Sequence, residues 1–213
     1  MAKEFEAALF DIDGTILDTD QFVFQAFKHS LMVHRGREVN RDDISFVLSK
    51  PLEECYILLE PDYDSKKLAQ THRDFQRANL HLSIPFGNSS DVLRRLSEAG
   101  VKIAAVTTRG SDSLNKTLEL AGILGYFDAV ISADDVTNHK PHPEPVQKAL
   151  EILMSSPQRA IMIGDSEVDV LAGKQAGTKT IGVTYGFHGE KVRESNPDYV
   201  VDDISEVLPL ILK

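Results

Sequence analysis

Short apolar runs recur along the chain, and they predict buried strands. The runs lack the polar alternation of a strand that faces water on one side, and those between residues 101 and 185 are rich in β-branched residues. The runs are AALF (7–10), VKIAAVTT (101–108), FDAVISA (127–133), RAIMIGD (159–165), KTIGVTY (179–185) and DYVV (198–201). This pattern is typical of a parallel sheet whose two faces are both covered.

Segments with a helical repeat separate these runs. The segment 89–100 opens with serine and aspartate, repeats apolar residues on one face and stops at Gly100, as a capped helix does. Similar segments cover 111–122, 143–153, 166–177 and 204–212, the last interrupted by Pro209. The regular exchange of strand and helix predicts an α/β fold, a doubly wound parallel sheet of the Rossmann-like kind with right-handed crossovers.

The stretch between residues 20 and 82 differs, because it shows helical periodicity and no strand pattern. Apolar residues recur at helical spacing over 21–36 and again over 64–82. Pro85 and Gly87 then mark a hinge at which the chain returns to the sheet. We therefore expect two domains, an α/β core formed by residues 1–18 and 83–213 and an inserted all-helical domain formed by 19–82.

Composition narrows the class of protein. The 213 residues are 42% hydrophobic and 26% charged, which is ordinary for a globular protein. The 23 basic and 33 acidic residues give a net charge of −10, which disfavours nucleic acid or an anionic membrane as a partner. The lone cysteine, Cys55, excludes an intramolecular disulfide and fits a reducing compartment. With no apolar run of membrane-spanning length, we expect a cytoplasmic protein.

Polar side chains stand where several predicted strands end, and in one loop. Strand ends of a doubly wound sheet are where ligands bind, at the point where the strand order reverses. Taken singly, these residues have ordinary explanations as helix caps, turn residues, strand-end hydroxyls and a solvated lysine. The set comprises Asp11 and Asp13, Thr107 and Thr108, Lys140 before two prolines, and Asp165 with Asp169 one helical turn later. Their order along the chain favours one shared site.

The chemistry of such a set points to phosphoryl transfer. Converging carboxylates repel one another unless a hard cation neutralises them, and oxygen ligands suit Mg²⁺. One carboxylate can then attack phosphorus while a lysine and hydroxyl groups stabilise the transferring phosphoryl group. A second carboxylate two residues on must lie beyond the strand end, where Gly14 allows a turn. From there it can move a proton.

The same residues carry a resemblance to a known family. DIDGT, VTT, the lysine of HKPHPEP and GDSEVD resemble the four motifs of the haloacid dehalogenase-like (HAD) hydrolase superfamily. The resemblance covers essentially the whole chain, and the helical insertion is similar to the C1-type cap of that superfamily. Within it, residues 107–146 and 161–186 resemble the phosphoglycolate phosphatase and pyrophosphatase branch.

The resemblance implies a role for each residue. Asp11 becomes the nucleophile and Asp13 the general acid and base. The implied phosphate ligands are Thr107, the backbone of Thr108, and Lys140. The implied Mg²⁺ ligands are Asp11, the Asp13 carbonyl and Asp165, with Asp169 binding through water or contacting the direct ligands. Ser166 either assists at the metal or only begins a helix.

These roles predict a Mg²⁺-dependent phosphatase that hydrolyses a small phosphorylated metabolite through an aspartyl-phosphate. A β-phosphoglucomutase-like phosphotransferase is the alternative, since it keeps both aspartates. Dehalogenases and phosphonatases lack the second one, so Asp13 argues against them. A non-catalytic binding module would be expected to have lost one of these groups, and none is missing.

Substrate choice is expected to lie outside the four motifs. Lys50 is the first candidate, either as a ligand of the anionic leaving group or as a solvent-facing side chain. Residues near Asp20–Phe24 and around Arg109 come next. The identity of the substrate and the choice between monomer and homodimer stay open.

Overall fold

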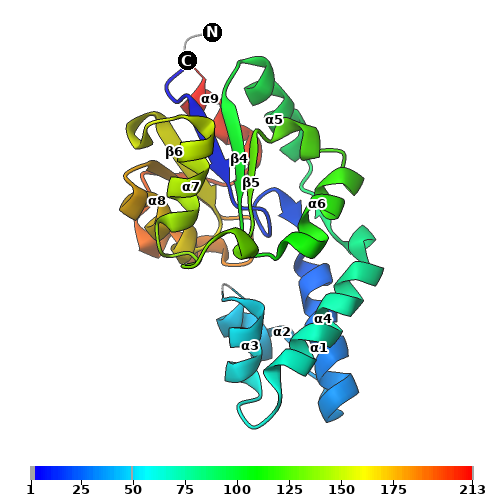
Figure 1. Ribbon diagram of the computed structural model, residues 1–213. Helices are drawn as coiled ribbons and strands as arrows, with labels where there is room; N and C mark the ends of the chain where they lie inside the picture. The colour runs from blue at the N-terminus through cyan, green and yellow to red at the C-terminus, as the bar shows by residue number, and fades with distance from the viewer. Residues whose placement is uncertain (1–2, 49, 213) are drawn as a thin grey trace. The chain divides into compact units, whose positions relative to one another are not determined.

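The computed structural model describes residues 3–48 and 50–212. The chain divides into two compact units, Met1–Asp18 with Ile84–Lys213, and Thr19–Ser83. Figure 1 shows the elements of both. The units are described one at a time.

A six-stranded parallel sheet forms the centre of the first unit. Its strands are β1 (Ala7–Phe10), β4 (Lys102–Val106), β5 (Ala129–Ile131), β6 (Ala160–Gly164), β7 (Lys179–Val183) and β8 (Tyr199–Val201). Their order across the sheet is β5-β4-β1-β6-β7-β8. The chain therefore runs outward from β1 on one side and then restarts beside β1 on the other, so the order reverses between β1 and β6. The predicted doubly wound α/β fold is confirmed.

Helices cover both faces of this sheet (Figure 1). The helices are α5 (Ser89–Glu98), α6 (Ser111–Leu120), α7 (Glu144–Leu153), α8 (Glu167–Ala176) and α9 (Val207–Ile211). Side chains of β1 alternate between the two layers: Ala8 and Phe10 pack with α5, α6 and α9, while Ala7 and Leu9 pack with α7 and α8. Every β1 side chain is thus buried, which explains why the strands read as continuous apolar runs.

A two-stranded antiparallel ribbon lies where the sequence predicts only a hinge. It pairs β2 (Leu17–Asp18) with β3 (Ile84–Pro85). Two residues are too few to show a strand period, and the pairing joins segments far apart in sequence. The chain thus leaves the first unit and returns to it through neighbouring main-chain segments.

The second unit is helical, and its described residues contain no strand. Its helices are α1 (Asp20–Arg35), α2 (Arg41–Ile44), α3 (Leu52–Leu59) and α4 (Ser65–Ala78). Phe27, Leu31, Tyr56 and Leu68 are buried together in its own small core. Short 3-10 helices are also present in the two units, at Ser45–Val47, Leu80–Leu82, Leu124–Tyr126, Ala133–Asp135, Pro157–Arg159, Gly189–Ser195 and Ile204–Glu206. None of the helices described is both long and apolar enough for a bilayer crossing.

Candidate active site

The polar residues at the strand ends meet at the point where the strand order reverses. Asp11 follows β1, Thr107 follows β4 and Asp165 follows β6. Strand β1 pairs in parallel with both neighbours, so Phe10 lies level with Ala105 and Ile163. Residues just beyond these positions therefore emerge side by side at one edge of the sheet, as ligand-binding residues of such sheets do.

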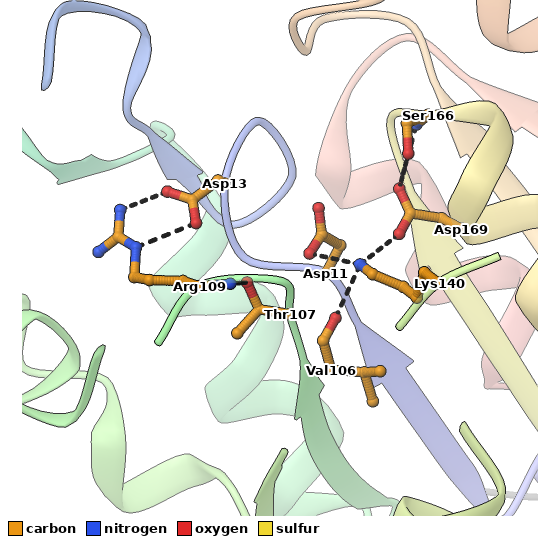
Figure 2. Close-up of polar contacts among 8 residues, drawn as sticks. All are labelled: Asp11, Asp13, Val106, Thr107, Arg109, Lys140, Ser166 and Asp169. Atoms are coloured by element: carbon orange, nitrogen blue, oxygen red, sulfur yellow. Dashed lines mark hydrogen bonds and ion pairs between the residues drawn. The ribbon is translucent and has the colours of Figure 1, made fainter. Parts of the chain in front are cut away.

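Lys140 reaches this edge from the loop that precedes α7. Its ammonium donates to Asp11 Oδ1 at 2.8 Å, Asp169 Oδ1 at 2.5 Å and the Val106 carbonyl at 3.0 Å, as Figure 2 shows. These contacts use all three ammonium protons. Burial lowers the pKa of Lys140, but the two carboxylates outweigh it, so the pKa is raised and the amine stays charged.

Three buried carboxylates surround this single ammonium. Asp11, Asp165 and Asp169 each offer an oxygen, and these oxygens lie within 4.8 Å of one another. Burial, with Asp169 adding to it and Lys140 opposing it, raises the pKa of Asp11 to about 7. Burial and the two neighbouring carboxylates raise the pKa of Asp165 well above its usual value. One lysine does not neutralise three carboxylates, so the remaining negative charge of the cluster favours the binding of a further cation.

The free oxygens of this cluster fit a hard metal ion. Asp165 Oδ2 accepts the backbone N–H of Phe187 at 2.7 Å, and Asp11 Oδ1 accepts from Lys140. The other oxygen of each of these aspartates accepts no hydrogen bond from any residue that the structure describes. Two unengaged carboxylate oxygens and no sulfur or nitrogen make a donor set suited to Mg²⁺.

Asp169 differs from these two aspartates because both of its oxygens are engaged. Oδ1 accepts from Lys140, and Oδ2 accepts from the Ser166 backbone N–H at 3.2 Å and from the Ser166 hydroxyl. Ser166 and Asp169 form the capping box at the start of α8, so the same contacts begin the helix and fix the carboxylate. Asp169 is thus placed to hold Lys140.

Glycines back the carboxylates at very close range, which sequence reasoning missed. A Cβ on Gly164 would lie 2.3 Å from Asp169 Cβ. A Cβ on Gly186 would lie 2.3 Å from Asp165 Cβ and equally close to the Gly14 carbonyl oxygen. These positions leave no room for a side chain. Only glycine therefore allows the backbone to lie this close to Asp165 and Asp169.

We expect Gly186→Ala to lower both stability and activity. The added methyl group would force Asp165 or the backbone of Gly14 to move, and such overpacking costs about 1–3 kcal/mol of unfolding free energy. Gly125→Ala is the matched control, because nothing lies within 4 Å of that Cβ position. Urea unfolding midpoints that fall equally for both variants would contradict this account.

Asp13 stands apart from the three buried carboxylates. It is half-buried beyond the end of β1, where Gly14 turns the chain at φ +82. Arg109 holds it, donating from Nε to Oδ2 at 3.1 Å and from its terminal nitrogen to Oδ1. In Figure 2 this pair lies on one side of Asp11, and Lys140 lies on the other. The sequence pointed to the region of Arg109 but not to this contact.

The remaining candidate residues lie in two places. Thr107 is buried, and its hydroxyl oxygen accepts the backbone N–H of Arg109 at 3.1 Å. Thr108 is half-buried, and its backbone N–H donates to none of the described residues. Lys50 belongs to the second unit, where it is exposed and pairs with Glu54 at 3.2 Å.

Comparisons with known proteins identify the family of the chain. A family model described as haloacid dehalogenase-like hydrolase matches residues 8–183. A candidate pyrophosphatase PpaX of Clostridium perfringens is 38% identical over 98% of both chains. The pyrophosphatase PpaX of Bacillus pumilus is 34% identical over 95% of this chain and 94% of its own.

A solved structure gives the same architecture. It belongs to a predicted phosphoglycolate phosphatase from Haemophilus somnus and superimposes with a TM-score of 0.88. It is 21% identical and covers 97% of this chain and 98% of its own. At that identity the likeness concerns the fold.

Proposed function

The chain belongs to the haloacid dehalogenase-like hydrolase family, and we propose that it is a Mg²⁺-dependent phosphatase acting on a small phosphorylated metabolite. The observation that carries this proposal is the placement of Asp11. Its carboxylate lies at the switch point of the sheet, with one oxygen held by Lys140 and the other accepting from no described residue. The carboxylate can therefore bind a cation through one oxygen and attack phosphorus through the other.

The first half of the reaction uses both aspartates. An oxygen of Asp11 forms a bond to phosphorus while the bond between phosphorus and the leaving oxygen breaks. The leaving oxygen takes the electron pair of that bond and a proton from Asp13. The positive charge of Lys140 and the backbone N–H of Thr108 stabilise the negative charge on the phosphoryl oxygens.

The second half regenerates the enzyme. A water molecule attacks the phosphorus of the aspartyl-phosphate, and Asp13 takes a proton from it. The bond between phosphorus and Asp11 breaks, which returns the free carboxylate and releases inorganic phosphate. Asp13 lies outside the Lys140 cluster, so the groups that move a proton and attack phosphorus are held separately.

We propose that Asp11, the Asp13 carbonyl and Asp165 bind Mg²⁺, with Asp169 supporting it. The excess negative charge of three carboxylates beside one lysine supports this assignment. A bound Mg²⁺ supplies charge neutralisation for the nucleophile and the phosphoryl oxygens.

The substrate class follows from the relatives. The named relatives are pyrophosphatases PpaX, so inorganic pyrophosphate is the first substrate to test and phosphoglycolate the second. We treat Thr19–Ser83 as the cap domain, and Lys50 is the first residue in it to test as a substrate ligand. We also propose a cytoplasmic location, because the one cysteine, Cys55, is free.

A phosphate-release screen over small phosphorylated metabolites tests this function. We expect turnover of p-nitrophenyl phosphate and of at least one metabolite with Mg²⁺. Chelation with EDTA should abolish it, and added Mg²⁺ should restore it. Turnover that is unchanged in EDTA would exclude the proposed metal. An isomerised sugar phosphate without phosphate release would instead indicate the phosphotransferase reaction.

A further inference from the structure

Arg109 is held in place by contacts of both its backbone and its side chain. Its backbone N–H donates to the Thr107 hydroxyl at 3.1 Å, and its carbonyl accepts from the Ala133 N–H at 3.0 Å. One terminal nitrogen of the guanidinium donates to the Thr117 hydroxyl at 3.3 Å. The side chain is only 7% exposed. The guanidinium is therefore anchored along one edge, and its other edge faces Asp13.

The edge that faces Asp13 is the one suited to an oxyanion. Nε and a terminal nitrogen of Arg109 donate to the two oxygens of the Asp13 carboxylate. Guanidinium groups bind carboxylates and phosphates in this bidentate geometry. Both oxygens of the Asp13 carboxylate therefore accept hydrogen bonds from the arginine. A leaving group that is to meet Asp13 must therefore loosen this contact.

The position of Asp13 also says where a leaving group would lie. In an in-line displacement the leaving oxygen departs on the side of phosphorus opposite to Asp11. If Asp13 moves a proton to that oxygen, the rest of the leaving group is within reach of the guanidinium bonded to Asp13. Figure 2 places Lys140 and Arg109 on opposite sides of Asp11. Two largely buried cations thus flank the nucleophile.

We propose that Arg109 binds a phosphate or carboxylate carried by the leaving group of the substrate, exchanging its ion pair with Asp13 for one with the substrate. This inference rests on the proposed phosphatase function and names the substrate class. Lys140 stabilises the phosphoryl group that is transferred, and Arg109 binds the oxyanion of the leaving group. A substrate with both anions matches both cations and frees the oxygens of Asp13.

With pyrophosphate the step balances without any further reactant. Asp11 forms a bond to one phosphorus, and the bond from that phosphorus to the bridging oxygen breaks. The departing phosphate keeps the electron pair of the broken bond and takes the proton of Asp13. Arg109 pairs with the negative charge of this phosphate. With phosphoglycolate the same guanidinium meets the carboxylate of the departing glycolate.

Steady-state kinetics with three substrates test this assignment. Pyrophosphate and phosphoglycolate carry an oxyanion on the leaving group, and p-nitrophenyl phosphate carries none. We expect Arg109→Met to lower kcat/KM for an oxyanion-bearing substrate by roughly 10- to 100-fold more than kcat/KM for p-nitrophenyl phosphate. Arg109→Lys should lie between, because it keeps the charge and loses the two-point contact. The two arms with oxyanions distinguish a phosphate from a carboxylate as the group bound.

Arg94→Met is the matched control. Arg94 also pairs with carboxylates, but it lies on the surface, where its side chain is 45% exposed. Its replacement should leave the ratio of the kcat/KM values unchanged. Each ratio is taken on a single preparation, so it does not depend on the fraction of the variant that is folded.

Two results would overturn the assignment while leaving the phosphatase function intact. One is an equal loss for all three substrates in Arg109→Met, which would make Arg109 a brace for Asp13 only. The other is a wild-type protein that turns over p-nitrophenyl phosphate and neither oxyanion-bearing substrate. If the wild-type protein releases phosphate from none of the three, the proposed function fails, and this assignment fails with it.

Discussion

We expect the Asp11→Asn variant to lose p-nitrophenyl phosphate turnover by roughly 10³-fold or more, because an amide cannot form the aspartyl-phosphate. The substitution keeps the shape of the side chain and an oxygen that can accept from Lys140. Turnover with Mg²⁺, measured beside a blank without enzyme, checks the result. Residual turnover close to that of the wild-type protein would mean that another group attacks phosphorus.

The same variant should fold at least as stably as the wild-type protein in EDTA. Burial and the nearby Asp169 raise the pKa of Asp11 from 3.8 to about 7. The folded protein therefore binds this proton more tightly than the unfolded chain, and stability falls as pH rises through that range. An asparagine does not ionise and removes this penalty. Urea unfolding in EDTA at about pH 8 should show an equal or higher midpoint.

Asp112→Asn is the control for this pair of measurements. Asp112 is exposed in the first turn of α6 and has no place in the candidate site. It should keep full turnover and change stability little. A marked fall in the unfolding midpoint of Asp11→Asn, with Asp112→Asn unaffected, would show that the carboxylate of Asp11 stabilises the fold.

Lys140→Met should have the largest effect on stability. The lysine is the only cation that the described residues place in contact with Asp11 and Asp169, and its side chain is 2% exposed. Removing one partner of a buried ion pair leaves charge uncompensated and costs about 3–5 kcal/mol of unfolding free energy. Methionine keeps the length of the side chain, so the loss is mainly electrostatic. Urea unfolding in EDTA measures it.

The loss from Lys140→Met should grow as pH rises. Without the ammonium, Asp11 and its neighbours lose the charge that opposes the rise in their pKa values. The folded variant then binds more protons than the folded wild-type protein, so its stability falls more steeply with pH. A deficit that stays constant across pH would show that lost packing, and not charge, is the cause.

Lys102→Met is the matched control for the lysine. Lys102 also pairs with an aspartate, Asp128 at 3.4 Å, but its side chain is 54% exposed. Exposed ion pairs contribute about 0–1 kcal/mol. If both lysine variants unfold at the same urea concentration, the buried pair contributes no more than the exposed one.

The sequence predicted the sheet well because each strand carries its own signal. The strands lie inside the predicted apolar runs, and β4, for example, ends at Val106 within the run 101–108. Buried strands need apolar side chains on both faces, so the pattern is local and can be read residue by residue. The short ribbon of β2 and β3 gave no such signal, because only main-chain pairing across the chain defines it.

The candidate site divides in the same way. The sequence shows which residue types stand at the strand ends, because a carboxylate that follows an apolar run is easy to recognise. Asp11, Asp13 and Asp165 are examples. The sequence does not show the contacts among them. Lys140 and Asp11 are separated by 129 positions, and Arg109 and Asp13 by 96, far beyond the window of about 11–18 residues that periodicity covers.

The sequence by itself therefore determined the α/β class, the helical insertion and the acidic residues that end the strands, since each depends on neighbours along the chain. Only the tertiary structure decided that both oxygens of Asp169 are engaged, while Asp11 and Asp165 each keep one oxygen that accepts from no described residue. It also decided that Arg109 donates hydrogen bonds to Asp13. These contacts form between loops that are far apart in the sequence. The order of the strands in the sheet decides which of these loops lie side by side.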